Sequence, residues 1–423
     1  MADSLTLHGK SYKIPRRPTV VVCIDGFDPT YLEQGIADGI LPTLASFVER
    51  GFSVTADAAM PSFTNPNNVS IITGAPTAAH GIAGNYFLDP ETGRETMIAD
   101  DTHLRGTTIL AELAARGVRV GAITAKDKLR RLISHGLDSA LEAATNSCDS
   151  NMANSNINLC FSAECADDKT LKWMGRASRP SQYSGDLSLF VLDAGVQILR
   201  ERHADLLYLT LSDFVQHKHA PGTPAANEFM SAVDARIGAL IGLGAIVAVT
   251  GDHGMSDKSN ADGEPNILFL QDLLEAQFGV GCARVICPIT DPFVKHHGAL
   301  GSFVRVHVRD SETNLIPDMI EYCRALTQVE LALPRAEAAK QFETPEDIEG
   351  DFAVVSKKDF VLGSKANEHD LASLEGHRLR SHGGLSELRV PLLMSEAITQ
   401  DEATLTRRWR NFNIFDLILN YGQ

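Results

Sequence analysis

Four apolar runs, each ending in polar residues, constrain the fold of this chain most strongly. The runs are "PTVVVCIDGFD", "VRVGAITAKD", "ADLLYLTLSD" and "AIVAVTGDHG". Continuous apolar strands of this kind are typical of parallel sheets that are covered on both faces. A stretch with helical apolar spacing precedes each of the last three runs: "TTILAELAARG", "LSLFVLDAGVQILRER" and "NEFMSAVDARIGALIGLG". This alternation predicts an α/β fold with a doubly wound, mostly parallel sheet.

The polar residues at the ends of these runs are the first candidates for a functional site. In a doubly wound sheet, ligands bind beyond the carboxyl ends of the strands. The four runs end in Asp25, in Lys126 and Lys128, in Asp213, and in the pair Asp252 and His253. We therefore expect these side chains to gather at one edge of the sheet.

The chain of 423 residues is long enough for a core and a smaller domain. The strand and helix pattern weakens over 261–375, which we interpret as an inserted α+β cap between core segments 1–260 and 376–423. Within the core, 125–185 is expected to be partly irregular and to contribute to the substrate pocket. The last stretch, "RRWRNFNIFDLILNYG", predicts an amphipathic helix that closes on the core surface.

The net charge, the cysteines and the lack of long apolar runs indicate which ligands the protein could bind and in which compartment it would be found. The net charge of −16 gives no general attraction to nucleic acid or to anionic membranes, so an anionic small molecule would need a local positive site. The seven cysteines are an odd number without a CxxC pair, which favours reduced thiols. No signal-peptide pattern and no run of about 18 apolar residues occurs, so we expect a cytoplasmic protein.

Aspartate and histidine are combined in two of the strand-end segments. Asp213 and His217 lie four residues apart in "SDFVQHKHA", a spacing that places both on one face of a helical turn. Asp252 and His253 lie between glycines in "VTGDHGMSD". Taken singly, these are a surface pair and a turn signal; together, oxygen and imidazole ligands without thiolates suit zinc, manganese or iron.

Further histidines occur downstream. His382 in "RSHGGLSE" precedes two glycines and an apolar run, and taken alone it is more often structural. The remaining candidates are weaker because they adjoin the Asp213 motif or fall in or near the predicted cap: His219, His296, His297, His369 and His377.

Thr64 stands in an unusual stretch, "PSFTNPNNVS", directly before the apolar "VSIITG". A threonine hydroxyl is a poor nucleophile at neutral pH, but coordination to a metal stabilises its alkoxide. The amino terminus of a following helix would favour the anionic group under attack. The structural alternative for Thr64 is an N-cap.

These motifs resemble a known group of enzymes in order and spacing. The segments "VVVCIDGFDP", "PSFTNPNNVSIITG", "HGIAGNYF", "SDFVQHKHA", "TGDHGM" and "SHGGLSELRVPL" are similar to the alkaline phosphatase superfamily. Within it, they resemble the nucleotide pyrophosphatase/phosphodiesterase-like branch. The resemblance covers most of the core and little of the cap, and it implies an alkaline phosphatase-like fold.

The resemblance also implies residue roles. Asp213, His217 and His382 would hold one zinc ion, and Asp25, Asp252 and His253 would hold a second, with manganese or iron as substitutes. Thr64 would be the nucleophile bound to the second ion, Asn85 in "GNYF" would donate a hydrogen bond to a phosphoryl oxygen, and His217 would also lie at the substrate.

Within that branch, "TAKDKLRR" makes the sequence similar to phosphonoacetate hydrolases, which cleave phosphonoacetate to acetate and phosphate. Cleavage of a carbon–phosphorus bond releases a carbanion equivalent, which is tolerable only if the charge spreads onto a carboxylate held by cations. Lys126 and Lys128 would supply these cations. Without the resemblance, the same pattern is equally compatible with a basic turn that is exposed to solvent. The implied mechanism proceeds through a phosphothreonine at Thr64.

Three other functions are compatible with parts of the pattern. A nucleotide pyrophosphatase or phosphodiesterase would need aromatic side chains to stack a base, and Phe63 and Tyr86 keep this option open. A phosphoglycerate mutase-like transferase is disfavoured because that branch uses serine and more ligands. A non-catalytic metal- or phosphonate-binding protein would retain the ligands without turnover. For the enzyme, we expect a homodimer.

Overall fold

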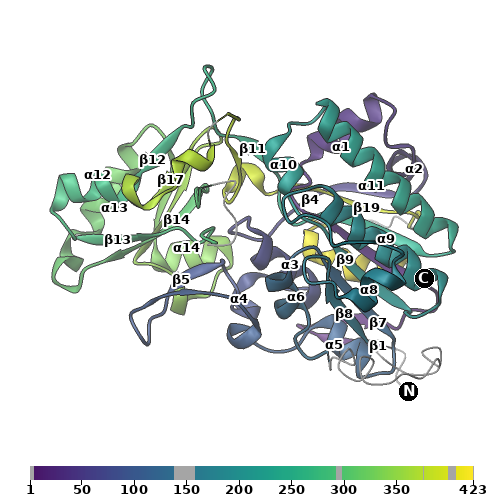
Figure 1. Ribbon diagram of the computed structural model, residues 1–423. Coiled ribbons are helices and arrows are strands. Elements are labelled where there is room, and N and C mark those ends of the chain that lie inside the picture. Colours follow the sequence, from purple (N-terminus) through teal and green to yellow (C-terminus); the bar gives the residue numbers. More distant parts are fainter. Residues whose placement is uncertain (1–3, 138–157, 292–297, 375, 399–405, 423) are drawn as a thin grey trace.

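The computed structural model describes residues 4–137, 158–291, 298–374, 376–398 and 406–422, and it has two lobes (Figure 1). The larger lobe contains a seven-stranded sheet with the order β4-β19-β10-β3-β9-β7-β8. Its strands are β3 (Thr19–Ile24), β4 (Phe52–Asp57), β7 (Val120–Thr124), β8 (Leu159–Ser162), β9 (Leu206–Thr210), β10 (Ile246–Gly251) and β19 (Arg389–Met394). The five strands from β10 to β8 are parallel, whereas β19 and β4 form an antiparallel edge.

Helices cover both faces of this sheet, which confirms the doubly wound fold. One apolar cluster joins the sheet to α1 (Pro29–Ala37), α2 (Pro42–Arg50), α9 (Asp186–Arg200) and α11 (Pro224–Gly242). A second cluster, on the opposite face, contains α3 (Thr64–Thr73), α5 (Ile109–Ala114) and α6 (Asp127–Ile133). The four predicted apolar runs are β3, β7, β9 and β10, and each is completely buried.

The carboxyl-terminal segment differs from the prediction of an amphipathic helix on the surface. It forms a short 3₁₀ turn over Asn411–Asn413, α16 (Ile414–Asp416) and a π-helical turn over Leu417–Tyr421. Its apolar side chains belong to the same core cluster as α3, and Phe415 and Leu417 have no exposed surface. The amino-terminal hairpin of β1 (Ser4–Leu7) and β2 (Lys10–Lys13) supplies part of the cover that the sequence did not predict.

The smaller lobe is built on a four-stranded antiparallel sheet with its own apolar cluster. The sheet has the order β13 (Ala283–Ile286), β14 (Phe303–Val308), β16 (Phe352–Ser356) and β15 (Val329–Pro334). It packs with α12 (Leu270–Phe278), α13 (Ile316–Ala325), α14 (Arg335–Phe342) and the pair of β12 (Ile267–Phe269) and β17 (Val361–Gly363). All these elements fall within 261–375, although the domain limits themselves stay a prediction.

The remaining elements connect the two lobes or decorate the core. They are α4 (Thr77–His80), β5 (Tyr86–Leu88), β6 (Glu95–Met97), α8 (Asp168–Trp173), α10 (Phe214–Lys218), β11 (Ser256–Asp257) and β18 (Arg380–Ser381). The short pair of β11 and β18 lies where the chain enters and leaves the smaller lobe. Among the described residues, no helix is both long and apolar enough to cross a membrane. The cysteines in the same ranges are all free thiols.

Candidate active site

The polar residues that follow the parallel strands come together at one edge of the sheet, as the sequence predicts. Strands β10, β3, β9 and β7 are consecutive neighbours in the sheet. They are followed by His253, Asp25, Asp213 and Lys126, respectively. The order of these side chains along the edge is therefore set by the order of the strands.

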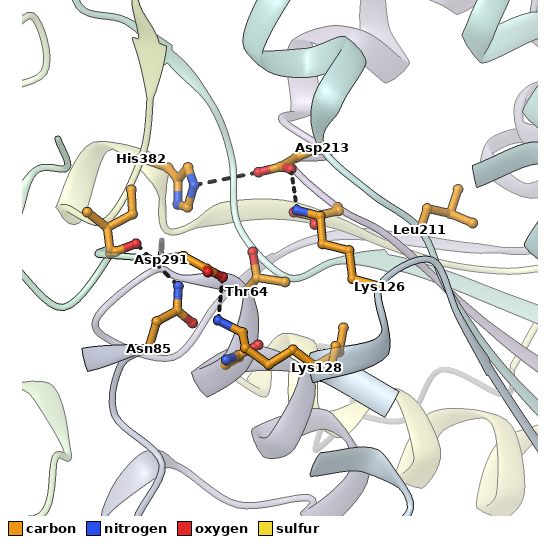
Figure 2. Close-up of a pocket in the computed structure, with 12 residues that line it drawn as sticks. Thr64, Asn85, Lys126, Lys128, Leu211, Asp213, Asp291 and His382 are labelled. Atoms are coloured by element: carbon orange, nitrogen blue, oxygen red, sulfur yellow. Dashed lines mark hydrogen bonds and ion pairs between the residues drawn. The ribbon is translucent and has the colours of Figure 1, made fainter. Parts of the chain in front are cut away.

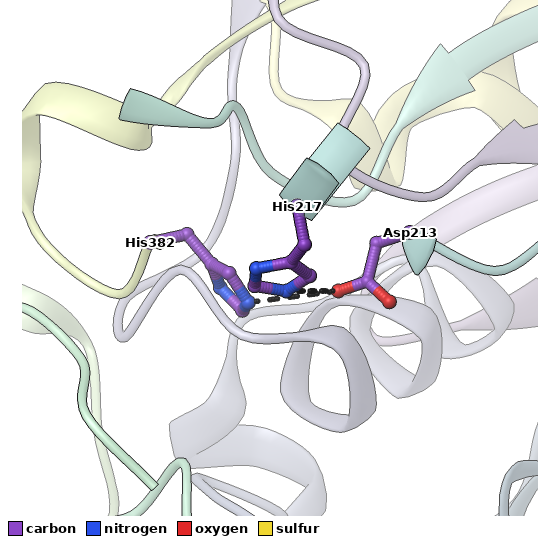
Figure 3. Close-up of side chains that lie close together, drawn as sticks. All are labelled: Asp213, His217 and His382. Atoms are coloured by element: carbon purple, nitrogen blue, oxygen red, sulfur yellow. Dashed lines mark hydrogen bonds and ion pairs between the residues drawn. The ribbon is translucent and has the colours of Figure 1, made fainter. Parts of the chain in front are cut away.

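One cluster consists of Asp213, His217 and His382, whose ligand atoms lie within 4.8 Å of one another (Figure 3). Nε2 of His217 lies 2.8 Å from Oδ2 of Asp213, and Nε2 of His382 lies 3.8 Å from the same oxygen. Asp213 precedes α10 and His217 lies within it, so the spacing of four residues does place both on one helical turn. His382 arrives from the far end of the chain, directly after β18.

A second cluster lies beside it and contains Asp25, Asp213 and His253. Nε2 of His253 is 3.2 Å from Oδ1 of Asp25 and 3.3 Å from the Oγ1 of Thr64. The rings of His253 and His382 are stacked with their centroids 3.6 Å apart, so the two clusters are adjacent. Asp213 belongs to both clusters and lies between them.

Asp252 is placed differently from the other predicted ligands. Its Oδ1 accepts hydrogen bonds from the backbone amides of Gly26 and His253, and its Oδ2 accepts one from Nδ2 of Asn68 at 3.1 Å. Oδ2 also lies 3.8 Å from Nε2 of His253. Asp252 therefore borders the second cluster and is already held by three donors.

All three clustered histidines direct the same ring nitrogen toward the clusters. Nδ1 donates to the carbonyl oxygen of Arg380 at 2.6 Å in His217, of Gly254 at 2.9 Å in His253 and of Ser62 at 2.9 Å in His382. These bonds leave Nε2 facing the carboxylates. A backbone acceptor on one nitrogen fixes the tautomer whose other nitrogen can bind a metal.

The buried carboxylates at the two clusters favour the binding of a cation. Burial raises the pKa of Asp25 well above its usual range, and the carboxylates of Asp213 and Asp252 raise it further. Neither carboxylate oxygen of Asp25 accepts a hydrogen bond from a described residue, although both are buried. A buried carboxylate without donors, grouped with a second carboxylate and with imidazole Nε2 atoms, has the donor set of a transition-metal site, so these residues fit zinc.

Thr64 lies where the two lobes meet. It is the first residue of α3, and the preceding Phe63 occupies the N-cap position without a side-chain hydrogen bond. Thr64 is therefore not the N-cap, and its hydroxyl faces His253 instead. Phe63 packs in the apolar cluster of the smaller lobe, whereas Val69 packs in that of the core, so both lobes fix the start of α3.

A cavity of about 40 Å³ lies in front of Thr64 (Figure 2). Both lobes contribute to its walls. Its polar lining consists of Asp25, Thr64, Asn65, Asn85, Lys126, Lys128, Asp213, Asp291 and His382.

The two lysines predicted at the end of β7 both face this cavity. Nζ of Lys126 lies 3.4 Å from Oδ1 of Asp213, and Nζ of Lys128 contacts the carboxylate of Asp291. Burial lowers the pKa of Lys126, but Asp213, Asp25 and Asp291 outweigh this effect and raise it overall. Burial also lowers the pKa of Lys128, which Asp291 only partly offsets and Lys126 lowers further. The pair thus places two ammonium groups at the cavity, each beside a carboxylate.

A family model described as type I phosphodiesterase / nucleotide pyrophosphatase matches residues 19–377. The chain belongs to this family. The match confirms the resemblance drawn from the motifs.

One solved structure is similar to this family member over its whole length. It is phosphonoacetate hydrolase from Sinorhizobium meliloti 1021 in complex with phosphonoacetate, with 42% sequence identity, a TM-score of 0.90 and coverage of 100% of both chains. The same enzyme was also solved with phosphonoformate. The chain therefore groups with the phosphonoacetate hydrolases within the family, and it has their alkaline phosphatase-like fold.

Two curated relatives match this chain over short segments. An uncharacterized pyrophosphatase/phosphodiesterase from Schizosaccharomyces pombe is 39% identical over 77 residues, which are 18% of this chain and 15% of that protein. A phosphonoacetate hydrolase from Penicillium oxalicum is 62% identical over 37 residues, which are 8% of this chain and 51% of that sequence. These matches cover well under two thirds of either relative.

Asn85 of this family member lies at the cavity through contacts with the smaller lobe. Its Nδ2 donates to the carbonyl oxygen of Ile289 at 3.3 Å, and its backbone amide donates to the carbonyl oxygen of Pro288 at 2.8 Å. One hydrogen of the amide therefore remains for a ligand.

The sequence prediction missed Asn65 and Asp291, both of which line the cavity. Asp291 lies in the region interpreted as cap, where no strand-end pattern marks it. Among the weaker candidates, His369 bonds to Ser364 and Gly298 in the smaller lobe, and neither it nor His377 lines the cavity. His296 and His297 lie outside the described residues.

Proposed function

We propose that this chain hydrolyses the carbon–phosphorus bond of phosphonoacetate to give acetate and phosphate. The observation that carries the proposal is that Lys126 and Lys128 face the same small cavity as Thr64 and the two histidine-carboxylate clusters. A phosphonate beside Thr64 would direct its carboxylate to the lysines. The full-length similarity to an enzyme solved with phosphonoacetate supports the same substrate.

The proposed cofactors are two zinc ions per chain. Asp213, His217 and His382 would hold one ion, and Asp25, Asp252 and His253 would hold the other beside Thr64, with Asp213 close to both. When bound, the ions would supply positive charge that lowers the pKa of nearby hydroxyl groups and neutralises phosphoryl oxygens.

The chain's own groups account for the two chemical steps. Oγ1 of Thr64 attacks phosphorus while its proton passes to solvent, and the amide of Asn85 donates to a phosphoryl oxygen. The P–C bond breaks, and its electron pair moves onto the acetate fragment as an enediolate. Lys126 and Lys128 stabilise that charge through the carboxylate, and water then protonates the carbon to give acetate. A second water hydrolyses the phosphothreonine and restores Thr64.

The structure weakens the case for a nucleotide pyrophosphatase or phosphodiesterase. Phe63 has no exposed surface and packs edge-on against His382, so its ring is not available to stack a base. Tyr86 does not line the cavity, and its hydroxyl donates to Glu95. Pockets for drug-sized ligands have volumes of roughly 300–1,000 Å³. The cavity of about 40 Å³ is far smaller, which favours a compact substrate.

One assay tests the proposal against these alternatives. The zinc-reconstituted protein is incubated in parallel with phosphonoacetate, phosphonopyruvate and a nitrophenyl nucleotide ester, and the release of phosphate or nitrophenol is followed. We expect phosphonoacetate to be the best substrate by kcat/KM. Faster turnover of the nucleotide ester would favour the diesterase, and binding of phosphonoacetate without phosphate release would favour a non-catalytic protein.

A further inference from the structure

Asn65, the residue after the proposed nucleophile, has a side-chain amide nitrogen without a hydrogen-bond acceptor among the described residues. It is the second residue of α3, is only 3% exposed and lines the cavity in front of Thr64. Its Nδ2 is buried and has no hydrogen-bond partner among the described residues. A buried donor without an acceptor is costly, and such groups in native proteins require an explanation.

The other two asparagines of the same stretch show what a structural role looks like here. Nδ2 of Asn67 donates to the carbonyl oxygens of Ala59 and Phe63 at 3.0 and 3.1 Å. The amide of Asn68 bonds to Asp252 and to Tyr208. These two amides fasten the start of α3 to its surroundings, whereas Asn65 lines the cavity and its buried Nδ2 is left without an acceptor among the described residues.

We propose that Nδ2 of Asn65 donates a hydrogen bond to a phosphoryl oxygen of the substrate, beside the donor from Asn85. This inference rests on the proposed function. In an in-line displacement, the nucleophile and the leaving group lie on opposite sides of phosphorus, with three oxygens around the middle. Asn65 shares a helix start with Thr64, whereas the lysines that would hold the leaving acetate come from the start of α6. We therefore expect Asn65 to bind a phosphoryl oxygen and not the carboxylate of the leaving acetate.

The consequence is selectivity for an unesterified phosphoryl group. A phosphonate such as phosphonoacetate presents three anionic oxygens, each a strong acceptor. In a diester, one of these positions carries an alkyl or aryl group, which would leave the amide of Asn65 buried without an acceptor. A site that hydrogen-bonds a group discriminates strongly against analogues that lack it, because the protein donor is then stranded.

The test uses Asn65→Leu, which has nearly the same shape but no donor. We expect its kcat/KM for phosphonoacetate to fall by about 10- to 100-fold, the range for a hydrogen bond to a charged group. Hydrolysis of bis(4-nitrophenyl) phosphate should stay unchanged or rise. The dissociation constant for inorganic phosphate, measured by calorimetry, should increase by a similar factor. The melting temperature should not fall, because the variant removes an unpartnered amide.

A matched control and a second variant complete the experiment. Asn227→Leu removes an amide that donates to Asp38, the C-cap residue of α1, in an exposed hydrogen bond, and it should change none of these quantities. Asn65→Ala should reproduce the phosphate-binding defect if the leucine variant folds poorly.

Unchanged phosphonoacetate turnover in both Asn65 variants would overturn the inference, as would an equal loss on both substrates together with a lower melting temperature. Failure of the wild-type protein to cleave phosphonoacetate would instead overturn the proposed function. In that case the phosphate affinity of the Asn65 variants still decides whether Asn65 binds a phosphoryl group.

Discussion

Nδ2 of Asn68 donates to Oδ2 of Asp252 at 3.1 Å, which joins the helix that begins at Thr64 to the end of β10. Oδ1 of Asn68 in turn accepts from the hydroxyl groups of Tyr208 and Thr210 at 2.7 and 2.8 Å. These two donors from β9 fix which end of the amide faces the carboxylate. The orientation of Asp252 therefore depends on a chain of hydrogen bonds that begins on β9, which β3 separates from β10 in the sheet.

Replacement of Asn68 by alanine should lower the affinity for zinc. Loss of an outer partner of a metal-binding carboxylate typically costs about 10- to 100-fold in metal affinity. Competition with a coloured chelator measures the change. Tyr208→Phe is the matched control, because Thr210 still holds the amide in place, and it should have a much smaller effect. Equal zinc affinities in Asn68→Ala and the wild-type protein would show that Asp252 needs no such support.

The strand-end residues could be predicted from sequence because one rule places them all. Parallel strands end at the same edge of a sheet. Once the four strands are identified in the sequence, Asp25, Asp213 and His253 are therefore predicted to lie close together, as they do. Asp291 could not be found in this way, because its approach to Lys128 depends on how the smaller lobe packs against the core. Asn65 stood in a motif already noted, but only the structure separates its unused amide from those of Asn67 and Asn68.

The carboxyl-terminal segment shows a second limit of sequence patterns. The pattern predicts an amphipathic helix on the core surface, yet the polar side chains of Asn411, Asn413 and Asp416 are buried as well. Nδ2 of Asn411 donates to Oδ1 of Asn67 on α3, and Nδ2 of Asn420 donates to the carbonyl oxygen of Ser11 in β2, so α3 and the hairpin contact polar side chains that the pattern assigns to solvent. Amphipathic periodicity reports which side of a helix is apolar, but it does not report what later covers the polar side.

Lys128→Met should abolish most phosphonoacetate turnover. Removal of a cation that stabilises transition-state charge costs about 10²- to 10³-fold in kcat. The change also takes the ammonium away from the largely buried carboxylate of Asp291, so we expect the free energy of unfolding to fall by roughly 3–5 kcal/mol. Phosphate release and chemical denaturation measure the two effects.

The double variant Lys128→Met/Asp291→Asn separates catalysis from stability. It should recover most of the lost unfolding free energy without recovering turnover, because no cation returns to the cavity. Recovery of turnover in the double variant would mean that Lys128 serves only to balance Asp291.

Asp25→Asn should have opposite effects on the metal-free and zinc-loaded protein. Burial and the neighbouring carboxylates of Asp213 and Asp252 disfavour the charge on Asp25 when no cation is bound. The neutral amide should therefore raise the melting temperature in the presence of a chelator. It should also reduce the further rise in melting temperature that zinc produces in the wild-type protein.

Asp252→Asn provides the comparison. The carboxylate of Asp252 accepts hydrogen bonds from Gly26, His253 and Asn68, so an amide nitrogen there would face a donor. This variant should lower the melting temperature of the metal-free protein. If both exchanges move that temperature in the same direction, the hydrogen bonds to Asp252 do not distinguish the two aspartates, and the prediction is wrong.

His80 should make the protein sensitive to acid. Its Nδ1 accepts from the backbone amide of Ile82 at 3.2 Å, so Nε2 carries the proton and donates to Oγ of Ser70 on α3 at 2.8 Å. Both nitrogens are thus used by the neutral ring. Burial and, to a lesser extent, the charge of His8 lower the pKa of His80 from 6.5 to about 3.

Between these two pKa values the unfolded chain binds the proton and the folded protein does not, so stability is complete above about pH 6.5 and is lost as the pH falls toward 3. Each pH unit within this window should cost about 1.4 kcal/mol. In His80→Gln, the free energy of unfolding of the chelator-treated protein should decrease less steeply over the same range. His103→Gln, at an exposed position, is the control and should retain the wild-type slope. Parallel slopes for His80→Gln and the wild-type protein, measured by urea denaturation from pH 7 to 4, would contradict a neutral buried His80.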